Sequence, residues 1–326
     1  MEISVVIPVY NAEPFIKNAV ESAIKQREAG EVLLIEDASS DNSFAVCQEL
    51  ERKHEKVRLI KHRDCKNHGA GASRNLGIKS AQYPYIAFLD ADDFYLDNRF
   101  KQADSLFKIM KNIDGVYEAV GISFYSESGK KRWLELKSDN LTTINKKLKP
   151  NKLAKELIIG KKGSLHLDGI VIKRSLLMKC GMFSEELEVH QDTELIIKLA
   201  ELGRLVPGNL ENPVAVRGIH NNRILRNKNK NYSKRLVWKN LAYWGYNNSL
   251  RRYKFILLLK NYFYYEFLIT FKKKTDTENN SRKFRLLILE LKKFHLYSMA
   301  AIFLISFSIL KYHLIDLLRK HQYGLK

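Results

Sequence analysis

Three aspartates within four residues, Asp90, Asp92 and Asp93, follow an apolar segment at residues 85–89. Carboxylates this close together repel one another, and a nearby positive charge normally compensates them. A hard divalent cation, Mn²⁺ or Mg²⁺, suits this role because carboxylates and a diphosphate can share its coordination shell. The alternative is that Asp92 and Asp93 cap a helix that starts near residue 98, and the four residues alone do not decide between the two.

Two further polar segments lie directly after or near apolar segments. Asp37 follows residues 32–35 and can accept hydrogen bonds from a base or a ribose, although it also suits a turn before a helix. Residues 68–77 read HGAGASRNLG, so glycines open a predicted helix that carries Arg74 in its first turns. Backbone N–H groups and a guanidinium in this position suit a phosphate. Three such segments at successive strand ends favour a nucleotide site.

The elements that must position these residues alternate regularly over the first hundred residues. Apolar segments predict strands at residues 3–9, 32–35, 57–60 and 85–89, and helices between them at 12–26, 41–54 and 71–80. This alternation predicts a largely parallel α/β sheet, in which ligands bind beyond the carboxyl ends of the strands.

The following hundred residues are less regular. They predict strands at 116–125 and 167–173, a polar segment at 139–150, and a helix that starts at Arg174. A helix at 191–202 has an apolar face, and Gln191 and Asp192 open it.

Four segments, in order and spacing as well as content, resemble glycosyltransferase family 2. They are residues 4–11, 36–41, 71–77 and 88–93, which read SVVIPVYN, EDASSD, GASRNLG and FLDADD. The resemblance covers residues 1–220 and implies a GT-A fold, an α/β architecture with a Rossmann-like, mostly parallel central sheet flanked by helices. It implies a catalytic domain at 1–220, with a nucleotide-sugar half at 1–100 and an acceptor half at 101–220. The change of composition after residue 220 predicts a basic, aromatic C-terminal helical extension at 221–326.

The resemblance also implies roles for single residues. In the family, the acid in the place of Asp37 contacts the base, Asp90 lies near the ribose, and Asp92 ligates the metal, Mn²⁺ or Mg²⁺. The residues implied in nucleotide-sugar binding are Pro8, Val9, Tyr10, Asp37, Arg74, Asp90 and Ala91. The sequence departs from the family at Glu36 and Ala38, where the family more often has Asp and Gly.

Segments 167–174, 181–186 and 190–195 resemble the acceptor side of the family, where an acidic pair, usually Glu-Asp, opens a helix. Here the pair is Gln191-Asp192, so Asp192 inherits the role of the catalytic base, although its position also suits a helix cap. His220 follows the last strand, where some relatives use a histidine to complete the metal shell or touch the diphosphate. An exposed loop histidine is an equal alternative.

The net charge of +20 belongs to the last third of the chain. Residues 1–220 hold 33 basic and 31 acidic side chains, whereas residues 221–326 hold 23 and 5. The basic residues surround predicted apolar helices at 253–271 and 284–318, which favours an anionic membrane surface over nucleic acid. The uncharged run at 294–310 is at the lower length limit for a spanning helix. We expect monotopic association, with packing on the catalytic domain or on a second subunit as the alternative.

These observations predict a metal-dependent, inverting transferase that moves a sugar from a nucleotide-sugar, a UDP-sugar, to a hydroxyl of a glycan or lipid-linked glycan. Such a reaction belongs to cell-surface polysaccharide synthesis. The apolar amino terminus is too short for a signal peptide, so we expect a cytoplasmic protein, peripheral on the inner face of the membrane. One alternative is a haloacid-dehalogenase-like phosphatase, because Asp90-Ala91-Asp92 also resembles the nucleophile motif of that family. The other is a nucleic-acid-binding protein. The sequence indicates neither the donor sugar nor the oligomeric state.

Overall fold

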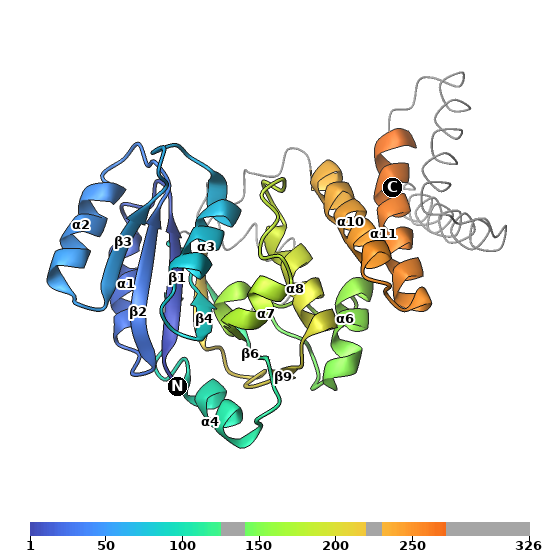
Figure 1. Cartoon of the computed structure of the whole chain (residues 1–326), viewed down its shortest axis with the longest axis horizontal. Helices are drawn as coiled ribbons and strands as arrows, with labels where there is room; N and C mark the ends of the chain where they lie inside the picture. Colours follow the sequence, from blue (N-terminus) through green and yellow to red (C-terminus); the bar gives the residue numbers. More distant parts are fainter. Residues whose placement is uncertain (125–140, 220–229, 272–326) are drawn as a thin grey trace, which may run out of the picture. The chain divides into compact units, whose positions relative to one another are not determined.

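The computed structural model describes residues 1–124, 141–219 and 230–271 of the chain. The chain divides into two compact units, Met1–Lys228 and Asn229–Lys326. The first unit is built on a seven-stranded sheet of order β3-β2-β1-β4-β8-β6-β9 and a three-stranded sheet of order β5-β10-β7 (Figure 1).

The first half of this unit alternates strands and helices as predicted. Its elements are β1 (Ile3–Val9), α1 (Ile16–Ile24), β2 (Ala29–Glu36), α2 (Ser43–Lys53), β3 (Val57–Lys61), α3 (Gly69–Ser80) and β4 (Tyr85–Phe88). Strand β1 pairs in parallel with both β2 and β4, and β2 pairs in parallel with β3. The predicted α/β class and the predicted strands are therefore confirmed, and helix α1 is shorter than residues 12–26.

The second half adds strands of mixed direction. Its elements are β5 (Phe94–Tyr95), α4 (Lys101–Ile109), β6 (Gly115–Tyr117), β7 (Val120–Phe124), α6 (Pro150–Ile159), a 3₁₀ helix (Leu167–Gly169), β8 (Ile170–Lys173), α7 (Arg174–Lys179), α8 (Gln191–Leu202), β9 (Leu205–Pro207) and β10 (Ala215–Ile219). Strand β8 runs antiparallel to β4 and β6, so the central sheet is mostly but not wholly parallel.

The prediction of one strand at residues 116–125 is wrong. Two strands, β6 and β7, occupy this region and belong to different sheets. Between them, the N–H of Glu118 donates to the carbonyl of Gly169, and the N–H of Ala119 donates to the carbonyl of Asn209. These bonds divert the backbone from one sheet to the other, and an apolar sequence pattern contains no sign of such a change of partner.

Both faces of the central sheet are covered by helices (Figure 1). Side chains that alternate along β1 point to opposite faces, as in any strand. Ile3, Val5 and Ile7 belong to the core shared with α1, α2 and α4. Val6 belongs to the second core, which also contains residues of α3, α6, α7 and α8.

The described part of the second unit is a pair of helices, α10 (Lys230–Asn247) and α11 (Arg252–Phe271). They bury Leu241, Leu258 and Phe263, and Arg235 forms an ion pair of 3.0 Å with Glu266. The predicted helix at 253–271 is confirmed, whereas 284–318, with the uncharged run 294–310, lies outside the described residues. In 1–124, 141–219 and 230–271, no helix combines the length and the apolar character needed to cross a bilayer.

Candidate active site

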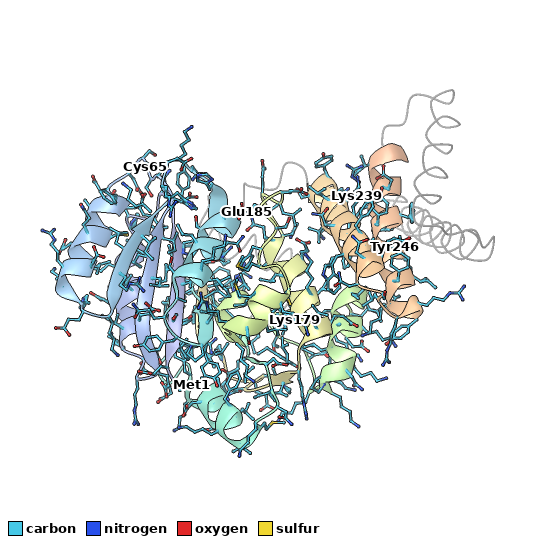
Figure 2. The ribbon with its side chains drawn as sticks, in the orientation of Figure 1. Met1, Cys65, Lys179, Glu185, Lys239 and Tyr246 are labelled. Atoms are coloured by element: carbon cyan, nitrogen blue, oxygen red, sulfur yellow. The ribbon has the colours of Figure 1, made fainter. Side chains whose placement is uncertain are left out.

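A pocket of about 380 Å³ opens beyond the carboxyl ends of β1, β2 and β4. Figure 2 shows Cys65 and Glu185 at this end of the first unit, with Met1 at the opposite end. The residues that line the pocket are Pro8, Val9, Tyr10, Asn11, Ala12, Phe15, Asp37, Asn67, Gly69, Ala70, Arg74, Asp90, Ala91, Asp92 and Glu188. All seven residues predicted to bind the nucleotide-sugar are therefore brought together, along with Asp92.

Asp37 joins the end of β2 to the start of α3. Its Oδ1 accepts a hydrogen bond of 2.7 Å from the N–H of His68, and its Oδ2 accepts one of 2.8 Å from the N–H of Gly69. Gly69 has a φ of +83°, in the left-handed region that favours glycine. Asp37 thus holds the glycine-rich turn against the pocket as well as lining it.

The two departures from the family motif, Glu36 and Ala38, have local structural consequences. The buried Glu36 carboxylate accepts hydrogen bonds from the N–H groups of Ala38 and Ser39, at 3.3 and 2.6 Å, so it stabilises the turn that follows β2. Ala38 has a φ of +58°, a left-handed conformation in which a side chain is disfavoured. This conformation explains why the family more often has glycine there.

Arg74 reaches from α3 to the aspartate-rich loop after β4. Its Nη2 donates a hydrogen bond of 2.6 Å to Oδ1 of Asp90, and its guanidinium lies 5.4 Å from the centre of the Phe183 ring. A guanidinium at the wall of a pocket can neutralise Asp90 and can also bind an anionic group such as a phosphate.

Two sets of side chains at or beside this loop have the donor atoms to hold a cation. Asp90 and Asp92 both line the pocket, and oxygen ligands of this kind suit Mg²⁺ or Mn²⁺. Asp90, Asp93 and His166 place one ligand atom each within 4.8 Å of one another. Asp93 is buried, however, and its Oδ1 accepts a hydrogen bond of 2.9 Å from the N–H of Gly218. The oxygen ligands of Asp90 and Asp92 therefore fit a divalent cation at the pocket. The other predicted ligand, His220, lies outside the described residues.

Behind this loop lies a series of buried charges that sequence reasoning missed. The Asp90 N–H lies 3.4 Å from Oδ1 of Asp168, and the Asp168 carbonyl accepts a hydrogen bond of 2.8 Å from Nε of Arg99. Nη1 of Arg99 in turn pairs with Glu118 at 3.0 Å, and neither side chain is exposed. Burial raises the pKa of Glu118, and the Arg99 charge opposes that shift. These contacts connect the strand crossing at Glu118 to the pocket loop.

The start of α8 lies close to the start of α3. A Cβ added to Gly71 would lie 2.9 Å from Cδ of Gln191, so a larger residue at 71 would displace this side chain. Asp192, the predicted base, is half-buried in the first turn of α8, and its Oδ1 accepts the N–H of Thr193 at 2.7 Å. Asp192 is not among the described residues that line the pocket, whereas Glu188 is.

Several lining residues were not predicted. Asn11 and Gly69 lie within segments 4–11 and 68–77 but were given no role there, and Asn67 directly precedes the second segment. Phe15 and Glu188 carry no signal in the sequence, because only the packing of the surrounding loops brings them to the pocket.

The chain matches known proteins mainly over this first unit. The sequence model described as Glycosyl transferase family 2 matches residues 4–179. The chain is 29% identical over 131 residues to the Uncharacterized glycosyltransferase EpsJ of Bacillus subtilis (strain 168), covering 40% of this chain and 36% of that protein. It is 35% identical over 127 residues to the Poly(ribitol-phosphate) beta-glucosyltransferase of Bacillus spizizenii, covering 35% and 20%. The chain thus spans well under two thirds of the length of these relatives.

The fold is also similar to a solved structure, S. aureus TarS 1-349 in complex with UDP-GlcNAc. The TM-score is 0.63 at 16% identity, covering 86% of this chain and 78% of that one. This likeness confirms the predicted GT-A fold. Because the family model extends over more than half of the residues, this chain belongs to glycosyl transferase family 2.

Proposed function

We propose that the chain transfers a sugar from a nucleotide-sugar, a UDP-sugar, to a hydroxyl of a glycan or lipid-linked glycan, with inversion at the sugar carbon. The observation that carries this proposal is the pocket, in which Asp37, Arg74, Asp90 and Asp92 meet at the carboxyl ends of three strands. A pocket lined by one basic side chain, Arg74, and several carboxylates suits a nucleoside, a diphosphate and a metal ion together. The complex of TarS with UDP-GlcNAc supports the choice of a UDP-sugar.

Four charged residues of the pocket have a proposed task. Asp37 and Asp90 bind the nucleoside, Arg74 binds the diphosphate, and Asp92 is the metal ligand that faces the pocket. When bound, Mn²⁺ or Mg²⁺ would compensate the negative charge of the departing diphosphate. One of two acids, Asp192 or Glu188, then removes the proton of the attacking hydroxyl.

The first test is a thermal-shift screen of nucleotide-sugars on the full chain, with and without Mn²⁺. We expect stabilisation by UDP-sugars that increases with Mn²⁺, because a ligand that binds only the folded state raises its stability. No stabilisation by any nucleotide-sugar would contradict the proposal.

The second test compares two candidate bases. Asp192 matches the family motif, whereas Glu188 lines the pocket. We expect Asp192→Asn to lower the turnover rate of transfer by roughly 10²–10⁴-fold at an unchanged KM for the donor, and Glu188→Gln to lower it less. The reverse order would assign the base to Glu188.

The match to glycosyl transferase family 2 argues against the phosphatase alternative. The aspartate motif follows the fourth strand of the chain rather than the first, and Asp93-Phe94 comes after it. We also propose a location on the inner face of the membrane, on the basis of the basic segment 272–326, which lies outside the described residues.

A further inference from the structure

Lysines gather on one segment of the first unit, residues 146–162. This segment holds seven lysines and one acid, Glu156, whereas the remainder of residues 1–220 holds 26 basic and 30 acidic side chains. Glu156 pairs with Lys162 at 3.0 Å, which leaves a large positive excess. The members of this lysine segment are Lys146, Lys147, Lys149, Lys152, Lys155, Lys161 and Lys162.

The fold concentrates this charge further. A bridge between Ile144 and Gly163, together with a hydrogen bond of 2.9 Å from the N–H of Asn145 to the carbonyl of Lys162, sets the two ends of the segment side by side. Gly163 makes this approach possible, because its φ is +103° and an added Cβ would lie 2.0 Å from the carbonyl oxygen of Thr143. Asn145, the neighbour of Lys146, therefore lies beside Lys162, so the two lysine-bearing ends of the segment meet there.

A second pocket, of about 330 Å³, opens at this place. Lys146 and Lys147 line it together with three uncharged amides and one acid: Gln102, Asn145, Asn209 and Glu211. Oδ1 of Asn209 accepts the N–H groups of Glu211 and Asn212 at 3.1 and 2.9 Å, so this wall of the pocket is held in place before any ligand binds. Ammonium groups bind phosphates, whereas amide and carboxylate groups bind hydroxyls.

The same wall connects to the candidate active site through bonded side chains. The N–H of Asn209 donates to Oε1 of Glu118 at 3.2 Å, and Glu118 pairs with Arg99, which holds the carbonyl of Asp168 beside Asp90. The two pockets thus lie at the ends of one buried series of contacts within the first unit. A long acceptor chain with one end at the aspartate-rich loop has a second place to bind on the same unit.

We propose that this second pocket and the lysine segment bind an acceptor chain that carries both hydroxyls and phosphodiesters, a polyol phosphate. The inference rests on the proposed transfer function and names the chemical class of its acceptor. A membrane surface fits less well, because no large apolar side chain is exposed on residues 146–162. A single-stranded nucleic acid also fits less well, because this segment offers no aromatic side chain on which a base could stack.

The test measures binding of a fluorescent ribitol phosphate oligomer to the full chain without any donor. We expect Lys146→Gln/Lys147→Gln to weaken binding roughly tenfold, the order expected from two exposed charge contacts, and to reduce its salt dependence. The matched control is Lys25→Gln/Lys111→Gln, which removes two exposed lysines of the same unit and should leave binding unchanged. Phosphatidylglycerol vesicles and single-stranded DNA are the competing probes.

Equal binding of the oligomer by both double variants would overturn the inference. So would a loss of vesicle or DNA binding in the Lys146→Gln/Lys147→Gln variant while oligomer binding persists. Thermal stabilisation by UDP-sugars, measured on the same samples, keeps the two proposals apart. If donors stabilise the protein and the oligomer does not bind, only the acceptor class is wrong, whereas absent donor stabilisation contradicts the transfer function itself.

Discussion

Two regions of the first unit, the pocket at the strand ends and the strand crossing at Glu118, hold their charged side chains in different ways. In residues 1–100, the acids of the pocket follow strands, and each lies within a few residues of the motif that predicted it, as Asp37 and Asp92 do. At the strand crossing, the pair of Arg99 and Glu118 is fully buried and joins the crossing to the pocket loop. Arg99 belongs to the end of the first half in sequence, but its partners come from the second.

This difference distinguishes side chains that face the ligand from side chains that stabilise the fold. A carboxylate at a strand end faces the pocket because parallel strands end at one edge of the sheet. A buried ion pair, in contrast, depends on the simultaneous approach of distant segments, and losing one partner leaves an uncompensated charge. We therefore expect changes at the pocket carboxylates to alter activity and changes at the buried ion pair to alter stability.

Of the changes that test this comparison, Asp92→Asn should have the largest effect. It keeps the size of the side chain but removes the charge that would hold a cation at the pocket, so we expect transfer to fall by roughly 10²–10³-fold in a folded protein. Turnover with a UDP-sugar, and Mn²⁺ affinity by electron paramagnetic resonance, would measure this.

The control for this change is His166→Asn, within the alternative group of Asp90, Asp93 and His166. We expect it to alter Mn²⁺ affinity less than Asp92→Asn does. A larger loss in the His166 variant would place the cation in the buried group and contradict the role of Asp92.

The next effect should come from Arg99→Met. It leaves Glu118 buried without its cation and frees the carbonyl of Asp168, so we expect the free energy of unfolding to fall by about 3–5 kcal/mol. Denaturant unfolding of the full chain would measure the change.

Arg58→Met is the matched control, since Arg58 pairs with Glu31 at 2.5 Å but is 38% exposed. Glu31 keeps its hydrogen bonds from Ser4 and from the N–H of Gln82, so we expect a cost of about 1 kcal/mol or less. Equal costs for the two variants would refute the structural role assigned to the buried pair.

The smallest effect should come from Ala38→Gly. Glycine relieves the left-handed conformation at φ +58° but gains more freedom in the unfolded chain, so we expect a net stabilisation of about 0.5–1 kcal/mol. Thermal unfolding of both variants would measure the sign of the stability change. The control, Ala70→Gly, lies within helix α3 and should destabilise the protein. Destabilisation by both changes would show that the turn tolerates alanine without cost.

The fold of the first hundred residues could be predicted because its signals are local. Apolar runs of strand length alternate with helices, and the site residues follow them directly. Glu188 and His166 could not be found in this way, since each reaches the site through a loop whose path depends on packing. The crossing at Glu118 was missed for the same reason, because residues 116–125 look like one strand until Gly169 and Asn209 take its backbone hydrogen bonds.

The sequence by itself determined the family, the parallel α/β beginning of the sheet, and the group of residues at the carboxyl ends of its strands. These features depend on residue type and on short, repeated spacing. Only the tertiary structure decided which carboxylates face the pocket, where Arg99 and Glu118 meet, and that Lys146 and Lys147 line a second pocket. The physical reason is that hydrogen bonds, ion pairs and cavities form between residues distant along the chain, and one sequence does not specify which of them meet.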